Sequence, residues 1–419
     1  MVTVTVIGLG FVGLTTALGL AEIGHRVYGY ETNAIKMKYL MNGNVDIFEP
    51  HLEQKLRQHL GKTFHLNEEF KIMISTSDCI FICVGSPCKD NGEVDLQQVK
   101  DAVIQVLDAL PCDKKHRTLV VKSTVPPGTC STVISPLIEA KGFNGSYIGL
   151  ASNPEFLREG MCWADFMNPS RIVIGSADTK DAELLKQIYE PIKAPVHLLS
   201  TSGAEFSKYL SNVMLATMIS FSNEMAYAAK CFGDVDIVKS FEALHDDYRL
   251  KNSGISSYIY PGCGYGGYCL PKDIKAFTKA LSMVGYNSTL LETVSNINDS
   301  VIGRLCDEIC DSIDVSKTIG ILGLAFKPGT DDVRETASYY IMKTLIARGY
   351  LNILAYDPVA LEKFIDSYPE LDISYASEVE TIVNYSDVIV VATAWDEFKT
   401  LDFKNKKVVD GRYIIKKRR

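Results

Sequence analysis

Short, nearly continuous apolar runs recur through the first half of the chain, and segments with helical periodicity separate most of them. Apolar runs bounded by turn residues are typical of buried β-strands. The predicted strands are Thr3–Gly8, Arg26–Tyr30, Cys79–Val84, Thr118–Lys122, Tyr147–Leu150 and Arg171–Ile174. Regular alternation of strands and helices predicts an α/β fold built on a parallel, doubly wound sheet.

The pattern changes near Ser200, where apolar residues begin to recur at helical spacing. Ser202 and Glu205 have the S-x-x-E spacing of a capping box, and Gly233 is a suitable helix stop. A helix between these points would extend about 45 Å, a length that suits a spine between domains or a dimer interface. A second helix is predicted from Thr289 to near Ile313.

Strands and helices alternate again toward the C-terminus. Further parallel strands are predicted within Lys317–Phe326, Leu351–Pro358, Asp387–Thr393 and Lys406–Arg412. This part lacks a G-x-G-x-x-G motif, so a second dinucleotide is not expected there. The predicted architecture is two Rossmann-like doubly wound parallel-sheet domains, residues 1–200 and 301–419, joined by a central long-helix domain, residues 201–300.

Composition and charge narrow the class of protein. The chain is 47% hydrophobic and 22% charged, as in an ordinary globular protein, and its net charge of −8 argues against nucleic-acid binding. Its 11 cysteines form no C-x-x-C pair and no zinc-type cluster with histidine, so we expect reduced thiols and no metal. No apolar run is long enough to cross a bilayer, so a soluble, cytoplasmic protein is expected.

A dinucleotide-binding fingerprint follows the first predicted strand. Gly8, Gly10 and Gly13 form G-x-G-x-x-G ahead of a predicted helix over Leu14–Ile23, and Glu31 ends the second strand. A carboxylate at that point accepts hydrogen bonds from the adenosine ribose and repels a 2′-phosphate, so NAD is favoured over NADP. The alternative is a glycine-tightened turn that binds no cofactor.

Polar side chains follow three further predicted strands. Ser86 lies in VGSP, Thr124 in KSTVPPGT, and Lys327 and Arg334 in GLAFKPGTDDVR. Doubly wound sheets bind ligands at the carboxyl ends of their strands, so the hydroxyls are placed to contact the nicotinamide side of a cofactor. The two cations could neutralise phosphates. Read singly, each segment could equally be an ordinary loop.

The segment PGCGYGGYCLPKD, Pro261–Asp273, is the most distinctive in the chain. Its glycines allow close approach of the backbone to a ligand or positive φ angles ahead of Cys269. Lys272 and Asp273 follow the thiol, and a cation and a carboxylate are what a site needs to activate a nucleophile and hold a water. Cys269 is therefore a candidate nucleophile, the alternative being one more inert cysteine.

Other charged residues have spacings that suit acid–base chemistry. Glu155 and Glu159, in NPEFLREG, would share a face if that segment were helical, and a carboxylate beside a thioester could act as a general base on water. Lys208 and Asn212 are four residues apart on the long predicted helix. A lysine there, in a cleft, would stabilise an oxyanion. The alternatives are a solvated acid pair and a surface helical pair.

Taken together, the motifs resemble a known family. The chain carries, in family order, GLGFVG, VGSP, KSTVPPGT, NPEFLREG, NPSRIVIG, KYLSN, GYGGYCLPKD and GLAFKPGTDDVRE. These segments resemble the UDP-glucose/GDP-mannose dehydrogenase family of nucleotide-sugar 6-dehydrogenases over essentially the whole chain. The resemblance implies two successive oxidations at sugar C6 with two NAD, without release of the aldehyde.

The family's mechanism gives roles to matching residues. It implies that Cys269 forms a thiohemiacetal and then, after the second oxidation, a thioester. Lys208 would stabilise negative charge at the sugar oxygen, and Glu155 is the candidate base in thioester hydrolysis.

Three further positions complete the implied catalytic set. Asn212 and Asp273 would position water or the oxyanion, and Thr124 would also hold that water. The implied cofactor contacts are Gly8, Gly10, Val12, Gly13, Glu31, Lys36, Ser86, Thr124, Glu159, Lys272 and Arg334. The implied substrate contacts are Glu155, Phe156, Leu157, Arg158, Glu159, Lys208, Asn212, Arg249, Tyr258, Ile259, Tyr260, Pro261, Gly262 and Lys327.

The chain departs from the family pattern in three places. Glu31 replaces the commoner aspartate, which should preserve the preference for NAD, and Ser86 stands where threonine is usual. The loop from Asp246 to Pro261 is longer than in compact members. That length leaves open whether Arg249 is the arginine that crosses the dimer interface to the sugar.

The residues on either side of Cys269 bear on the substrate. Members acting on N-acetylated sugars tend to carry histidine before the cysteine and VDP after it, whereas Tyr268 and Lys272-Asp273 here favour UDP-glucose, giving UDP-glucuronate. The alternatives are GDP-mannose or a UDP-N-acetylhexosamine.

A two-electron β-hydroxyacid dehydrogenase would share the Lys-x-x-x-Asn pair but lack the thiol and the third domain. A homodimer formed through the central helices is expected.

Overall fold

The computed structural model describes residues 1–66, 68–143, 147–251 and 254–415. These residues form two compact units, Met1–Leu210 and Ser211–Arg419. Helix α9 (Thr201–Phe232) runs through the boundary between them. The division into three domains therefore stays a prediction. Within the described residues, no helix combines the length and the apolar character needed to cross a membrane.

The first unit is built on an eight-stranded sheet with the order β3-β2-β1-β4-β5-β6-β7-β8. Its strands are β1 Thr3–Ile7, β2 Arg26–Tyr30, β3 Phe64–His65, β4 Cys79–Ile82, β5 Arg117–Val121, β6 Ile148–Ser152, β7 Ile172–Ser176 and β8 Val196–Leu199. Its helices are α1 Phe11–Glu22, α2 Ala34–Met41, α3 Leu52–His59, α4 Phe70–Thr76, α5 Gln97–Ala109, η1 Cys130–Ile134, α6 Ser135–Ala140, α7 Cys162–Met167 and α8 Thr179–Tyr189. Neighbouring strands are parallel except β6 and β7, which are antiparallel.

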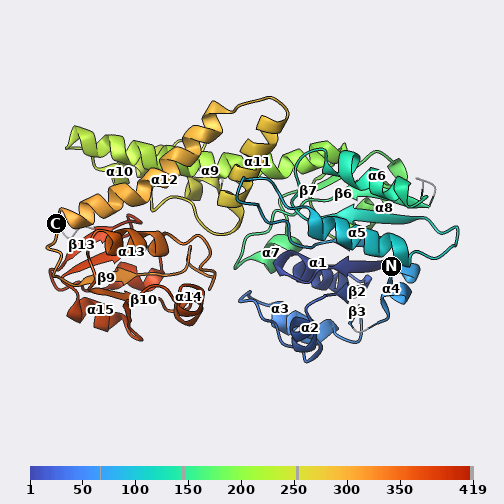
Figure 1. The fold of residues 1–419 in the computed structure, drawn as a ribbon, viewed down its shortest axis with the longest axis horizontal. Helices are drawn as coiled ribbons and strands as arrows, with labels where there is room; N and C mark the ends of the chain where they lie inside the picture. The colour runs from blue at the N-terminus through green and yellow to red at the C-terminus, as the bar shows by residue number, and fades with distance from the viewer. Residues whose placement is uncertain (67, 144–146, 252–253, 416–419) are drawn as a thin grey trace. The chain divides into compact units, whose positions relative to one another are not determined.

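Helices cover both faces of this sheet, as in other doubly wound folds (Figure 1). Side chains of α1, α3, α7 and α8 pack on one face, where they meet strand residues such as Val4, Val6 and Phe81. Side chains of α4, α5, η1 and α6 pack on the other, against Ile80 and Ile82. The strand order reverses between β1 and β4, and ligands of doubly wound sheets bind outside the carboxyl ends of strands at such a point.

The second unit combines helices with a smaller sheet of order β11-β10-β9-β12-β13, in which all pairs are parallel. The strands are β9 Ile319–Leu322, β10 Ile353–Tyr356, β11 Ser374–Tyr375, β12 Val388–Val391 and β13 Lys407–Asp410. The helices after α9 are α10 Ile237–His245, η2 Ile255–Tyr258, α11 Cys269–Met283, α12 Thr289–Cys310, α13 Ala337–Ala347, α14 Leu361–Ser367, α15 Val379–Tyr385 and η3 Asp396–Thr400. Apolar side chains of α12, α13 and α14 pack on one face of this sheet, and those of α15 and η3 on the other.

The predicted α/β class is confirmed, with three local corrections. Strands β3, β8 and β11 were not predicted, and the antiparallel junction of β6 and β7 makes the first sheet mixed. The capping box of Ser202 and Glu205 does not form, because α9 already begins at Thr201. The Glu205 carboxylate instead accepts hydrogen bonds from the backbone N–H groups of Gly128 and Cys130, at 2.6 and 2.8 Å.

Candidate active site

The glycine-rich turn after β1 has the geometry needed for a bound pyrophosphate. Gly8 has φ +86°, and a Cβ on Gly13 would lie 1.7 Å from the Gly8 carbonyl oxygen, so neither position tolerates a side chain. A Cβ on Gly10 would meet nothing within 4 Å, which leaves open space above the turn. Helix α1 starts directly afterwards at Phe11, so its N-terminal N–H groups and dipole favour an anion there.

Glu31 lies at the end of β2, facing this turn. Its carboxylate accepts hydrogen bonds from the backbone N–H groups of Leu9, at 3.2 Å, and Asn33, at 3.0 Å. Oε1 also lies 3.5 Å from the Thr32 hydroxyl, whereas among the described residues Oε2 accepts only the Leu9 bond and has a second lone pair that could accept from a ribose hydroxyl, as the fingerprint predicts. The turn, the helix terminus and Glu31 therefore fit the adenosine diphosphate half of NAD.

Asp357, at the corresponding strand end of the second sheet, is fully engaged by the protein. Its Oδ2 accepts from the N–H groups of Leu324 and Ala325 and from Trp395 Nε1, and the residue as a whole is 3% exposed. A ribose could not reach it. This closure is consistent with the prediction that the second sheet binds no dinucleotide.

The other residues predicted to contact NAD in the first unit lie in loops after strands or in the first turns of helices. The Ser86 hydroxyl donates to the Thr124 carbonyl oxygen at 2.6 Å, which joins the loops after β4 and β5. Lys36 lies near the start of α2, with its ammonium 3.4 Å from Asp46. Val12 is in the first turn of α1 and is partly buried.

A buried ion pair joins two predicted catalytic residues. Lys208 Nζ lies 2.8 Å from Glu155 Oε1, and the two side chains are only 6% and 8% exposed. Glu155 belongs to the extended segment after β6, so the conditional helix over Glu155–Glu159 does not form. The Leu157 N–H donates to the second carboxylate oxygen at 2.5 Å, so local backbone geometry fixes the side chain.

The surroundings of this pair keep the carboxylate charged. Burial raises the pKa of Glu155, but the ammonium of Lys208, the Leu157 N–H and the charge of Lys122 outweigh it and hold that pKa below its ordinary value. Phe156 covers the pair: Lys208 Nζ lies 5.6 Å from its ring centroid. A carboxylate that stays ionised in a dry environment is suited to act as a base.

Cys269 is the first residue of helix α11, which has 15 residues, and it is exposed. The positive end of a helix dipole stabilises a thiolate at such a position. The turn before it depends on glycine. Gly267 has φ +74°, and a Cβ there would lie 2.6 Å from the Phe326 ring, while a Cβ on Gly266 would lie 2.3 Å from the Glu335 carbonyl oxygen.

Asp273 connects two other predicted residues one turn further into α11. One carboxylate oxygen accepts from Asn212 Nδ2, and the other lies against Lys272 Nζ, each at 2.6 Å. Asp273 is 1% exposed, so both bonds form in an environment of low dielectric. Burial lowers the pKa of Lys272, but the Asp273 carboxylate overrides this and raises that pKa above its ordinary value. Asn212 follows Lys208 by one turn of α9.

Two predicted cofactor contacts of the second unit meet on one aromatic ring. The guanidinium of Arg334 lies 4.5 Å, and the ammonium of Lys272 5.8 Å, from the centroid of Tyr268. Arg334 is also paired with Asp332 at 2.6 Å. Tyr268 directly precedes Cys269 in the chain, so both cations lie beside the residue before the thiol.

The predicted substrate stretch Tyr258–Gly262 is held within the second unit by polar contacts. The Gly262 N–H donates to Asn223 Oδ1 at 2.8 Å, and Tyr260 donates to the Tyr413 carbonyl oxygen at 3.2 Å. A Cβ on Gly262 would lie 3.2 Å from a guanidinium nitrogen of Arg412. Arg412 was not among the predicted site residues, although it ends the last predicted strand.

Three other predicted contacts are cations, of which Arg249 and Arg158 are exposed and Lys327 is partly buried. Arg249 is 72% exposed in its side chain and pairs with Asp247 at 2.5 Å. Arg158 is 52% exposed and pairs with Asp165 at 2.7 Å. Lys327 Nζ lies 5.5 Å from the Phe326 ring centroid. Leu157, Glu159 and Ile259 complete the set: the first two are partly buried and Ile259 is buried.

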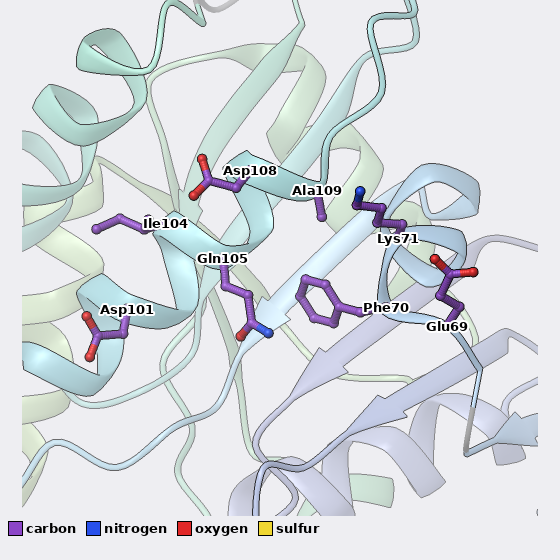
Figure 2. Close-up of a pocket in the computed structure, with 8 residues that line it drawn as sticks. All are labelled: Glu69, Phe70, Lys71, Asp101, Ile104, Gln105, Asp108 and Ala109. Carbon is purple, nitrogen blue, oxygen red and sulfur yellow. The ribbon is translucent and has the colours of Figure 1, made fainter.

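A groove elsewhere in the first unit is not part of this chemistry. It has a volume of about 490 Å³ and lies between the ends of α4 and α5 (Figure 2). Figure 2 shows Phe70 and Gln105 lining it, with the carboxylates of Glu69, Asp101 and Asp108 around them. No predicted site residue lines this groove.

Family comparisons cover the chain in three consecutive segments. The models match under the descriptions UDP-glucose/GDP-mannose dehydrogenase family NAD binding domain, at residues 2–193, central domain, at 202–300, and UDP binding domain, at 320–417.

Individual relatives are similar over nearly the full length. UDP-glucose 6-dehydrogenase AglM of Haloferax volcanii is 34% identical, with 99% of this chain and 97% of that protein covered. UDP-glucose 6-dehydrogenase YwqF of Bacillus subtilis is 36% identical, with 94% and 88% covered. A solved UDP-glucose dehydrogenase from Pyrobaculum islandicum has a TM-score of 0.92 at 36% identity, covering 99% and 95%. A UDP-D-ManNAc dehydrogenase from Pyrococcus horikoshii has a TM-score of 0.86 at 26% identity, covering 99% and 96%.

Proposed function

Because the chain belongs to the UDP-glucose/GDP-mannose dehydrogenase family, as its motifs predicted, we propose that it oxidises UDP-glucose at C6 to UDP-glucuronate. It is an NAD-dependent dehydrogenase, and the glycine turn with Glu31 fits that cofactor. The observation that carries the finer proposal is Cys269, exposed at the start of α11, one turn before Asp273, whose buried carboxylate binds Lys272 and Asn212.

The proposed reaction has two oxidations and a hydrolysis. When bound, NAD would supply the hydride acceptor for each two-electron oxidation, so one substrate would require two NAD. Between them, the Cys269 sulfur adds to the C6 aldehyde as a thiohemiacetal, and the second oxidation leaves a thioester. Water then adds to the thioester carbonyl and the C–S bond breaks, with its electron pair leaving on sulfur, to give the carboxylate and the free thiol.

Charges within each unit suit these steps. In the first unit, the Lys208 ammonium would stabilise the developing alkoxide and oxyanion. The ionised Glu155 carboxylate would take the proton from the attacking water. In the second unit, Asn212 and Asp273, locked together at 2.6 Å, would position water or oxyanion, and the helix terminus would favour the Cys269 thiolate.

UDP-glucose is preferred over other nucleotide sugars on two grounds. The relatives named as UDP-glucose 6-dehydrogenases are 34% and 36% identical over nearly the whole chain, against 26% for the UDP-D-ManNAc dehydrogenase. Tyr268 and Lys272 also differ from the pattern expected for N-acetylated sugars. The same chemistry on GDP-mannose or a UDP-N-acetylhexosamine is the second candidate.

The test is stoichiometry with a panel of substrates. Purified protein with NAD and limiting UDP-glucose should form two NADH per sugar and release UDP-glucuronate. Activity with GDP-mannose or a UDP-N-acetylhexosamine alone would replace the substrate, and one NADH per sugar would overturn the four-electron reaction.

We further propose a homodimer formed through α9. Large apolar side chains are exposed at helical spacing along it: Phe206, Leu210, Met214, Phe221 and Met225. An exposed stripe of this kind marks a protein interface, and a second copy is the expected partner. Phe221→Glu should shift the mass measured by light scattering from dimer to monomer. Tyr385→Glu, at a more exposed aromatic of α15, is the control and should leave a dimer.

A further inference from the structure

Glu205, in the first turn of α9, is a buried carboxylate to which the proposed reaction gives no role. The residue is 2% exposed. Its two oxygens accept hydrogen bonds from the backbone N–H groups of Gly128, at 2.6 Å, and Cys130, at 2.8 Å. Burial raises the pKa of Glu205 above its ordinary value, and the hydrogen bonds that it accepts lower that pKa only in part. A carboxylate that is costly to bury is typical of a functional site.

The two N–H groups lie at the end of the loop that follows β5 and at the start of η1. This loop carries Thr124, which is predicted to contact the nicotinamide side of the cofactor. The start of the loop is held by the Ser86 hydroxyl, which donates to the Thr124 carbonyl oxygen at 2.6 Å. Glu205 holds the other end, at Gly128. The loop is therefore anchored to the segment after β4 on one side and to α9 on the other.

The same helix carries Lys208, three residues after Glu205, so the two side chains project from one face of α9. The start of α9 is fixed on the sheet. A Cβ on Gly175, in β7, would lie 2.6 Å from the Ala204 Cβ and 2.7 Å from the Ser200 carbonyl oxygen. Packing this close leaves the first turn of the helix no room to slide. All of these residues belong to the first unit, Met1–Leu210.

Glu205 thus connects two residues that must act on the same sugar carbon in the proposed function, Lys208 at the sugar oxygen and Thr124 on the side of the cofactor. Misplacing a reacting or positioning group by about 1 Å can cost about a hundredfold in rate. We propose that Glu205 is a positioning residue, which holds the Thr124 loop on α9 and so sets the spacing between Thr124 and Lys208. The inference rests on the proposed function, and in this role Glu205 touches neither substrate nor cofactor.

The experiment compares Glu205→Gln and Glu205→Ala with a matched control. Glutamine keeps the size of the side chain but turns one acceptor into a donor, so one of the two hydrogen bonds is lost, and alanine removes both. The control is His25→Ala. His25 is 5% exposed and also makes two hydrogen bonds to the backbone, with the Val2 N–H at 3.3 Å and the Ile188 carbonyl oxygen at 2.8 Å. It directly precedes β2, so it lies at the amino ends of the strands, away from the site.

Two measurements are made on each variant. Hydrogen–deuterium exchange of the protein without ligand should become at least about tenfold faster over residues 123–134 in both Glu205 variants, because the anchoring bonds are lost, and should not change there in His25→Ala. With UDP-glucose and NAD, kcat should fall at least about tenfold in both Glu205 variants. Their dissociation constant for NAD should stay close to the wild-type value, because the glycine turn and Glu31 hold the adenosine half separately.

The outcomes separate this inference from the proposed function. A folded Glu205→Gln with wild-type kcat would overturn the inference, as would an equal loss of kcat in Glu205→Ala and His25→Ala. Failure of Glu205→Gln to fold would also overturn it, since the residue would then be structural. If wild type forms no NADH from UDP-glucose, the proposed function fails. The exchange measurement needs neither substrate nor cofactor, so faster exchange over residues 123–134 would then still support the anchoring of the loop, and unchanged exchange would overturn it.

Discussion

Lys208 Nζ lies 2.8 Å from Glu155 Oε1, and less than a tenth of either side chain is exposed. Removing one partner of such a pair leaves an uncompensated buried charge, whereas replacing both by neutral groups of similar size removes that penalty. A purely structural ion pair and a catalytic one therefore respond differently when stability and activity are measured together.

Lys208→Ala should destabilise the protein by roughly 3 kcal/mol, because Glu155 is left buried without its partner. It should also lower kcat far more than it weakens NAD binding. The double variant Lys208→Met/Glu155→Gln should recover most of the stability in urea unfolding while staying inactive. Equal losses in kcat and in NAD affinity would recast Lys208 as a structural residue.

Much of the fold could be predicted because its buried strands appear in the sequence as short apolar runs bounded by turn residues. Arg26–Tyr30 was predicted with the bounds that β2 has. Strands β3 and β11 have two residues each, too few for any periodicity to be read. Strand β8 is exposed along its length, so it lacks the burial on which the prediction of the other strands depended. The antiparallel direction of β7 depends on how its connection crosses the sheet, which no local pattern records.

Lys122 gives a stability prediction with a definite sign. Its pKa is about 8 in the folded protein, because burial disfavours its charge, and near 10.5 in the unfolded chain, so the unfolded chain binds more protons between those values. Stability contributed by this site should therefore rise as pH increases from about 8 to about 10.5.

The measurement is urea unfolding of wild type and Lys122→Met at pH 7.5 and pH 10. The unfolding free energy of wild type minus that of Lys122→Met should be larger at pH 10 than at pH 7.5, by about 2 kcal/mol or more. Taking a difference cancels the titration of other groups. A difference that is the same at both pH values would show that Lys122 titrates normally.

The candidate site was predictable where a motif carries it in consecutive residues, as for Cys269, Lys272 and Asp273. Partnerships across the sequence were not. Asn212 and Asp273 are 61 residues apart, and only packing of α9 on α11 brings the amide to the carboxylate. Likewise, the sequence indicated only that Lys122 ends a strand. Its buried contact with Asn153 depends on the segment after the neighbouring strand β6, which no local pattern predicts.

Two cysteines close together in sequence should separate the role of the thiol from its packing. Cys269 is exposed at a helix start, whereas Cys263 is 4% exposed with its thiol 3.2 Å from the Gly411 carbonyl oxygen. Cys269→Ser should lower turnover by about three orders of magnitude or more, because an alcohol supplies no thiolate. It should also form no stable acyl-enzyme by intact mass.

Cys263→Ser is the matched control, since its hydroxyl can keep the bond to Gly411. It should leave kcat near the wild-type value and change stability by no more than about 1 kcal/mol. Normal turnover by both variants would remove the thiol mechanism altogether.

The glycine turn before the thiol offers a test of how Cys269 is placed. Gly267 and Gly285 both have positive φ, +74° and +83°, but a Cβ on Gly267 would lie 2.6 Å from Phe326, whereas one on Gly285 would meet nothing within 4 Å. Alanine at Gly285 should cost only the backbone strain of about 1 kcal/mol. At Gly267 the clash adds roughly 1–3 kcal/mol, relieved only if the turn moves.

Because Cys269 is two residues beyond Gly267, movement of the turn would displace the sulfur. Gly267→Ala should therefore lower kcat at least about tenfold, since small misplacements of a reacting group are costly, while Gly285→Ala should leave kcat unchanged. Thermal unfolding run alongside the assay separates the two effects. If both variants lost the same stability and the same activity, the turn would have no specific role in placing the thiol, and Cys269 would owe its position to α11 alone.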